Sequence, residues 1–418
     1  MGVIPAPIFI GINSSRNPGK NWIPPYQVRG KLSQARNDRN EKHQVIAYNK
    51  RRKDKFMHEE MIGKHKTEVD TPALLLHMDA VERNIRKMAD YFAGKPCKLR
   101  PHIKTHKLPL IAHKQIEAGA IGITCAKLGE AKIFFEAGMK DVLIANEIVG
   151  AVKIERLVNL SGYGNLICCV DHYENAKNIS EAAGRIGRNI NVLVEVNVGI
   201  NRCGVMPGKP ALELVRKITD LRNLAFRGVM GYEGGVFILD LEEKMKKCAE
   251  SNRLLVETKE LIEKNGFPVE IVTAGGSNTF YLTGLYPGIT DIQVGSYVTM
   301  DAHNKFYGLD FEQAVTVLAT VISRPERERA VTDTGMKSLS TDNGLPLCKE
   351  PGLSITRLNE EHGHLKIENP DHDLSVGDKI ELIPSHGCTT IPLYDRYVVI
   401  RNDRVEAVME MVARGANQ

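Results

Sequence analysis

Residues 121–145 read IGITCAKLGEAKIFFEAGMKDVLIA, and this stretch decides the expected fold. Its first five residues and its last five, Asp141–Ala145, form short and largely apolar runs that are typical of buried strands. Between them, Leu128–Phe135 places apolar residues at helical spacing. Strands that are apolar on both faces need cover on both faces, which parallel strands joined by helices provide. The stretch therefore predicts one strand–helix–strand unit of a parallel sheet.

The same alternation recurs about eight times between residues 67 and 312. The runs expected to form strands are 73–76, 98–103, 121–125, 141–145, 166–170, 192–198, 226–232, 269–273 and 292–294. This repetition predicts an α/β fold, a (β/α)₈ barrel of the TIM type. In such barrels the active groups lie on the loops that follow the carboxyl ends of the strands.

The pattern of apolar and polar residues changes after residue 312. Polar and apolar residues alternate in 314–323, 363–368, 379–383 and 396–405, with turn pairs such as Asn343-Gly344 between these runs. Alternation with a period of two indicates strands that have one buried face. Residues 313–418 are therefore expected to form a C-terminal β domain.

Composition favours a soluble cytoplasmic enzyme and excludes several other classes. The chain has 418 residues and no apolar run near the roughly 20 residues that a membrane helix needs. The eight cysteines are scattered, so reduced thiols are expected. The net charge of +5 lies in residues 1–66, which hold 14 Lys and Arg against 5 Asp and Glu, while the rest is mildly acidic. Nucleic acid and membrane are therefore not expected partners.

Residues 1–66 form a separate segment, rich in Pro, Asn and Arg and without regular apolar periodicity. A disordered basic extension is expected there, followed by a barrel at 67–312. An organelle-targeting segment, or a true start at Met57 or Met61, fits the same residues.

One lysine stands out at a predicted strand end. Lys104 lies in the run Arg100–Lys107, RPHIKTHK, with Arg100, His102, His106 and Lys107 close by in sequence. Neighbouring cations would favour the neutral amine, which is the nucleophilic form, and a Schiff base is the natural use of such a lysine. The alternative is a solvated basic turn on a surface that binds nucleic acid or phosphate.

Two glycine-containing loops are candidates for binding an anion. Residues 273–279, TAGGSNT, follow one predicted strand, and residues 293–297, QVGSY, follow the last. Backbone N–H groups at paired glycines can surround a phosphate, and barrels of this type often bind phosphate after strands seven and eight. Each loop alone would more often be a plain turn. Both together with Lys104 indicate a phosphorylated aldehyde cofactor.

Several motifs, in order along some 350 residues, carry a family resemblance. They are Asp70–Leu74, Arg100–Lys107, Cys125–Ala131, Ala145–Gly150, Glu195–Val205, Gln293–Tyr297, Glu360–Gly363 and Pro384–Cys388. From about residue 69 to the C-terminus, the chain resembles the fold-type III pyridoxal-phosphate enzymes of the D-threonine aldolase and D-serine dehydratase group, relatives of alanine racemase.

The resemblance implies roles for individual residues. Lys104 would carry pyridoxal 5'-phosphate, and Tyr232 would lie beside its ring. Arg202 would face the pyridine nitrogen and leave it unprotonated, because a guanidinium does not give up its proton. The alternative for Arg202 is an ordinary surface arginine. The residues implied to bind the cofactor through the two loops are Thr273, Gly275, Gly276, Ser277, Gly295, Ser296 and Tyr297.

His386 and Cys388 are candidate ligands of a divalent metal. In a strand, residues i and i+2 project to the same face, so both side chains could reach one ion. Without the resemblance, such a pair is more often packing. The resemblance implies a metal that binds the β-hydroxyl or carboxylate of the substrate. The thiolate favours zinc, whereas the aldolases show His-x-Asp, which suits manganese or magnesium.

The expected function is a metal-assisted lyase that cleaves β-hydroxy-D-amino acids to glycine and an aldehyde. The alternative is dehydration to a 2-keto acid and ammonia, which the His-x-Cys pair favours. A histidine that aldolases carry just beyond the equivalent of Tyr232 is also missing here. Among the candidate bases His303, His362 and His364, the motif context favours His362. A racemase or a non-catalytic cofactor carrier is less favoured, and a homodimer is expected.

Overall fold

The computed structural model describes residues 60–234 and 236–418, so most of the predicted N-terminal extension lies outside the described residues. Its last residues are ordered: the Gly63 N–H donates to Val405 O at 2.8 Å, and the Lys66 N–H donates to Asp403 O at 2.8 Å. The expectation of disorder up to residue 66 is therefore wrong for this short part. Within the described ranges, no helix is long and apolar enough to span a membrane.

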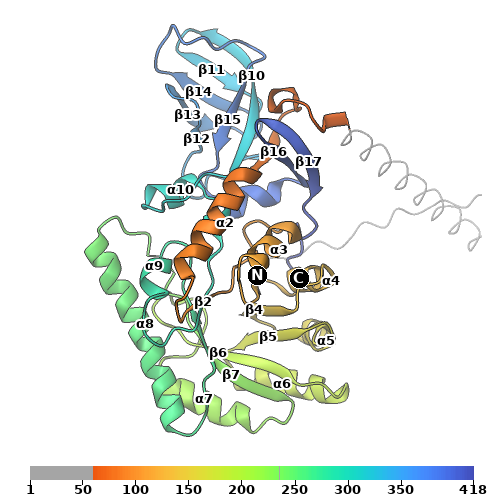
Figure 1. Cartoon of the computed structure of the whole chain (residues 1–418), viewed down its shortest axis with the longest axis vertical. Coiled ribbons are helices and arrows are strands. Elements are labelled where there is room, and N and C mark those ends of the chain that lie inside the picture. The colour runs from red at the N-terminus through yellow and green to blue at the C-terminus, as the bar shows by residue number, and fades with distance from the viewer. Residues whose placement is uncertain (1–59, 235) are drawn as a thin grey trace, which may run out of the picture. The chain divides into compact units, whose positions relative to one another are not determined.

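Eight parallel strands form the expected barrel (Figure 1). They run in the order β2-β9-β8-β7-β6-β5-β4-β3, and a parallel bridge between His102 and Thr124 joins the β2 and β3 ends of this order. The strands are β2 (Lys98–Leu99), β3 (Ile123–Cys125), β4 (Asp141–Glu147), β5 (Asn165–Val170), β6 (Ile190–Glu195), β7 (Leu224–Met230), β8 (Ile271–Ala274) and β9 (Asp291–Ile292). The prediction of a TIM-like barrel is confirmed.

Helices connect these strands and cover the barrel (Figure 1). In α7, for example, Ala211, Leu212, Val215 and Ile218 are buried at intervals of one, three and three residues, which gives the helix one apolar face. The helices are α2 (Met78–Phe92), α3 (Pro109–Glu117), α4 (Leu128–Glu136), α5 (Ala151–Leu160), α6 (Tyr173–Arg185), α7 (Lys209–Thr219), α8 (Leu241–Lys264) and α9 (Phe280–Thr283).

The first predicted barrel strand belongs to another sheet. β1 (Ala73–His77) pairs antiparallel with β10 (Val315–Glu326) and parallel with β16 (Arg396–Arg401). The assignment of residues 73–76 to the barrel is therefore wrong. An apolar run indicates that a strand is buried on both faces, but it does not indicate to which sheet the strand belongs.

The remaining strands complete a C-terminal β domain, as predicted. Residues 396–405, expected to be one run, form a hairpin whose turn residues Asn402 and Asp403 have φ of 49° and 60°. The further elements are η1 (Lys66–Glu68), η2 (Ser296–Val298), α10 (Ala302–Phe306), β11 (Arg329–Thr332), β12 (Leu347–Cys348), β13 (Leu353–Leu358), β14 (Gly363–Ile367), β15 (Lys379–Ile383), α11 (Gly387–Thr390), η3 (Ile391–Leu393) and β17 (Arg404–Glu410).

Candidate active site

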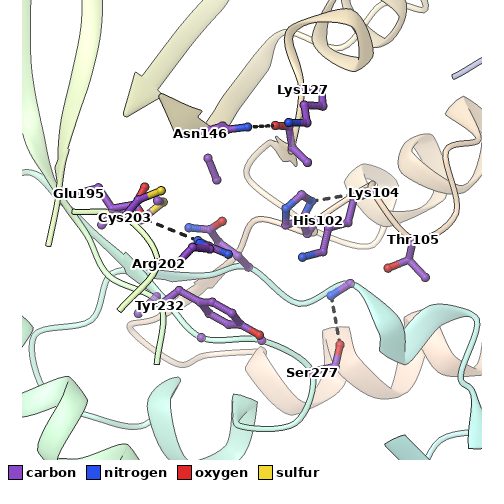
Figure 2. A pocket seen from close by; sticks show the side chains of 18 of the residues that line it. His102, Lys104, Thr105, Lys127, Asn146, Glu195, Arg202, Cys203, Tyr232 and Ser277 are labelled. Carbon is purple, nitrogen blue, oxygen red and sulfur yellow. Dashed lines mark hydrogen bonds and ion pairs between the residues drawn. The ribbon is translucent and has the colours of Figure 1, made fainter. Parts of the chain in front are cut away.

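A cavity of about 380 Å³ lies where the barrel loops meet (Figure 2). Its walls come from the carboxyl ends of β2, β3, β4, β6, β7, β8 and β9 and from the segments that follow them, which is where a barrel of this kind places its active groups. Eight of the predicted cofactor residues line it: Lys104, Arg202, Tyr232, Gly275, Gly276, Ser277, Gly295 and Ser296.

Two of the cations expected to act on Lys104 are neutralised by carboxylates. The Arg100 guanidinium forms an ion pair with Asp141, and its Nε lies 3.5 Å from Asp291 Oδ1. Lys107 forms a buried ion pair with Glu130. Each positive charge is thus paired with a carboxylate, and the ion pairs hold strand and helix ends together.

The two histidines near Lys104 are not cationic either. Both are buried, and burial lowers the pKa of His102 well below its usual value and that of His106 to about 3. The expectation that four cations surround Lys104 is therefore wrong, because the fold pairs or neutralises each of them. Lys104 itself is partly exposed and faces the cavity (Figure 2).

The two glycine-containing loops are held against each other by Ser277. Its Oγ accepts the backbone N–H of Gly295 at 3.1 Å and that of Tyr297 at 3.0 Å (Figure 2). At Gly295, a Cβ would lie 2.9 Å from His102 O, so a side chain there would collide with the segment that carries Lys104. Gly275 has φ of +76°, a conformation that side chains disfavour.

Two of the predicted cofactor residues do not line the cavity. The Thr273 hydroxyl accepts a hydrogen bond from Gln293 Nε2 at 3.1 Å. The Tyr297 hydroxyl accepts one from Gln115 Nε2 at 2.9 Å, and the side chain is fully buried. Both side chains support the loops from behind, so their expected direct contact with the cofactor is not what this geometry provides.

Arg202 lies at the opposite end of the cavity from Ser277 (Figure 2). Its guanidinium carbon is 5.5 Å from the Tyr232 ring centroid, and its Nη2 is 3.5 Å from Glu195 Oε1. Burial, together with a neighbouring charge and hydrogen bond from Glu147, raises the pKa of Glu195 to about 8. A proton on Glu195 would relieve the repulsion between the two neighbouring carboxyl groups beside Arg202.

Sequence reasoning missed Glu147 and Glu195 as site residues, although both lie in motifs that carried the resemblance. Ligand atoms of Glu147, Glu195 and Cys203 lie within 4.8 Å of one another, close enough to suit a metal ion. The guanidinium of Arg202 beside them already supplies a positive charge, and the structure favours this ion pair over a second metal centre.

His386 and Cys388 are neighbours, but not for the expected reason. Cys388 lies in the first turn of α11 and His386 is the residue before that helix, so the prediction that both lie in a strand is wrong. Their side chains interact: hydrogen bonds that His386 donates to Cys388 and Asp342 raise its pKa to about 9. Cys388 Sγ also lies 3.2 Å from the hydroxyl of Thr105, a cavity residue. The pair therefore borders the cavity.

Asp342 orients His386 and was not predicted. Its Oδ2 lies 2.6 Å from His386 Nδ1, which leaves Nε2 as the nitrogen available to a ligand. Carboxylates commonly fix metal-binding histidines in this way. No sequence motif marked Asp342, because it lies 44 residues before its partner.

Of the three candidate bases, His303 is placed nearest to this pair. Its backbone N–H donates to Ser385 O at 3.1 Å, and its ring packs 4.6 Å from that of Phe237. His362 is exposed in the turn between β13 and β14 and does not line the cavity, so the geometry of this chain does not support its expected role as base. His364 Nε2 is bound to Asn359 Oδ1 at 3.1 Å in the same hairpin.

Comparisons with known proteins agree with this architecture. The family model of the alanine racemase N-terminal domain matches residues 76–303, and that of the serine dehydratase domain matches residues 314–400. A D-threonine aldolase from Arthrobacter sp. is 37% identical over 83% of this chain and 93% of its own length. The crystal structure of D-threonine aldolase from Filomicrobium marinum is 36% identical, with a TM-score of 0.82 over 85% of this chain and 98% of that one.

A dehydratase is also similar, at lower identity. The D-threo-3-hydroxyaspartate dehydratase of Delftia sp. is 28% identical over 80% of this chain and 95% of its length. A D-threo-3-hydroxyaspartate dehydratase has also been solved as a cysteine-to-alanine variant in a metal-free form, with a TM-score of 0.76 and 26% identity over 83% of this chain and 99% of that one.

Proposed function

Because the chain belongs to the alanine racemase N-terminal domain family of pyridoxal-phosphate enzymes, we propose that it is a lyase that cleaves β-hydroxy-D-amino acids to glycine and an aldehyde. The observation that carries the proposal is the meeting of Lys104 and both glycine-containing loops in one cavity of a chain that is 37% identical to a D-threonine aldolase over 353 residues.

The residues of the cavity fit pyridoxal phosphate. Gly275 and Gly295 stand where a Cβ would collide with neighbouring protein atoms, so the two loops can pack closely at the cavity wall, where Ser277 and Ser296 would bind the phosphate. Lys104 supplies a primary amine at the cavity wall, which would hold the cofactor covalently through its aldehyde. When bound, the cofactor stabilises negative charge that develops on the substrate amino acid.

Arg202 and the His386–Cys388 pair would set the chemistry around that cofactor. Arg202 keeps its protons, so it would donate a hydrogen bond to the pyridine nitrogen and leave that nitrogen unprotonated. His386 and Cys388 would hold a divalent ion, for which a thiolate favours zinc, and such an ion supplies Lewis acidity to a substrate oxygen. His303, against the same loop, would remove or return the proton of the substrate hydroxyl.

Dehydration is the second candidate. The thiolate at Cys388 and the stretch Tyr232–Phe237, which lacks the histidine of the aldolases, favour it. Incubation of the purified protein with D-threonine, with and without zinc or manganese, separates the reactions. The proposal predicts glycine and acetaldehyde in stoichiometric amounts, whereas 2-oxobutyrate and ammonia would establish dehydration instead.

A further inference from the structure

Lys244 is a buried cation directly behind the loop 273–279. It lies on α8, its residue is 2% exposed, and its Nζ donates to Asn278 Oδ1 at 2.8 Å. Burial lowers its pKa. Among the described residues, Lys244 has no carboxylate partner in an ion pair, whereas other cations of the same helix are paired: Lys247 with Glu243, Arg253 with Glu257 and Lys259 with Glu263.

The position of Asn278 is fixed from its other side. Its Nδ2 donates to Val236 O at 2.5 Å, which orients its carbonyl oxygen toward Lys244. The side chain is 8% exposed, so the hydrogen bond to Lys244 is shielded from water. A lysine held in this way is a fixed charge and not a mobile surface group.

A buried carboxylate touches the same loop. Glu233 is 6% exposed and accepts hydrogen bonds from the Gly275 N–H at 3.1 Å, from the Thr283 hydroxyl at 2.9 Å and from the Thr279 hydroxyl. All three hydrogen bonds use the carboxyl oxygens of Glu233 as acceptors and hold the loop in shape. A carboxyl group at this position opposes the binding of a phosphate by the loop.

We propose that Lys244 is a positioning residue that gives the loop 273–279 its affinity for the cofactor phosphate, by placing a positive charge behind the loop and fixing Asn278. The inference rests on the proposed cofactor, pyridoxal 5'-phosphate. Lys244 does not line the cavity, so it would act on the cofactor phosphate through Asn278 and not by direct contact. A purely structural lysine would instead stabilise the fold without distinguishing phosphorylated from unphosphorylated ligands.

The test compares two ligands that differ only in the phosphate. Full-length protein is freed of cofactor and titrated with pyridoxal 5'-phosphate and with pyridoxal, and the visible absorbance reports binding. Lys244→Gln keeps a hydrogen-bond donor for Asn278 and removes the charge. It should weaken binding of pyridoxal phosphate about tenfold or more and that of pyridoxal by less than about twofold, while Lys244→Arg should stay near wild type.

Lys247→Gln is the matched control, because it removes one positive charge from the exposed side of the same helix. It should leave both affinities unchanged. Equal weakening of both ligands by Lys244→Gln, or no weakening of either, would overturn the role of Lys244 while leaving the proposed function intact. Wild-type protein that binds neither ligand would overturn both. Thermal unfolding of each variant shows whether the compared proteins are folded.

Discussion

The barrel loops and the segment 384–388 of the C-terminal domain were both recognised by short motifs, yet they form their sites differently. The loops at 273–279 and 293–297 present backbone and small side chains, and their place follows from the strands before them. The segment 384–388 presents two side chains from a helix start, oriented by the distant Asp342. A site built from backbone at strand ends is thus fixed by the fold, whereas a site built from side chains depends on the local conformation and on partners far along the chain.

The largest expected effect falls on the barrel side of this comparison. Lys104→Ala should lower lyase activity on the order of 10³-fold or more, because no other group would hold the cofactor covalently. Lys127→Ala, at the other cavity lysine, should retain most of the activity. Steady-state kinetics with D-threonine measures both. Full activity of Lys104→Ala would remove the lysine from the mechanism.

The next effect tests which of two histidines, His303 or His362, acts as the base. His303→Ala should lower kcat by about 10²-fold or more, the usual loss when a general base is removed. His362→Ala should leave kcat unchanged, because this side chain is exposed in a hairpin turn. A larger loss of kcat in His362→Ala than in His303→Ala would show that His362, as the motif at 360–363 indicated, is the base.

The oriented histidine predicts a smaller loss in metal affinity. Asp342→Asn should weaken metal binding by about 10–100-fold, since it removes the carboxylate that orients His386. Cys388→Ala should reduce bound metal further. Metal content after dialysis against a graded chelator series measures both variants. If both bind metal as wild type does, the pair is not the metal site.

Two glycines of the barrel loops allow a finer test of the backbone cradle. Gly295→Ala should weaken cofactor binding about tenfold, because its Cβ would lie 2.9 Å from His102 O and the loop would have to move. Gly276→Ala should cost less, because its Cβ would meet only the Tyr232 ring at 3.4 Å. Equilibrium titration with pyridoxal phosphate gives the two affinities. Equal losses would mean that the tight approach at Gly295 is unimportant.

The smallest effect concerns the acid pair beside Arg202. The pKa of Glu195 is raised from 4.5 to about 8, so the folded protein holds a proton that the unfolded chain releases. The free energy of unfolding should therefore fall as pH rises through this window. Glu195→Gln should reduce that fall. Urea unfolding at pH 6 and pH 8.5 compares the slopes, and identical slopes would place the proton elsewhere.

Much of the fold could be predicted from sequence, because β4 to β7 each contain a short apolar run and amphipathic helices separate them. β1 was misassigned because burial on both faces fits either sheet. The cations around Lys104 were misjudged because their partners, such as Asp141 and Glu130, lie 23 to 41 residues away. Glu147 and Glu195 were missed because they lie far apart in the sequence, and the effect of Glu147 on the pKa of Glu195 arises only when the fold brings the two carboxyl groups together.

The central claim is that Lys104 carries pyridoxal phosphate. Reduction of the purified holoenzyme with borohydride, followed by proteolysis and mass spectrometry, tests it directly, because reduction makes a Schiff base permanent. A phosphopyridoxyl group is expected on the peptide that contains Lys104 and on no other lysine. A label on another lysine, or an unlabelled protein with the cofactor bound, would contradict it.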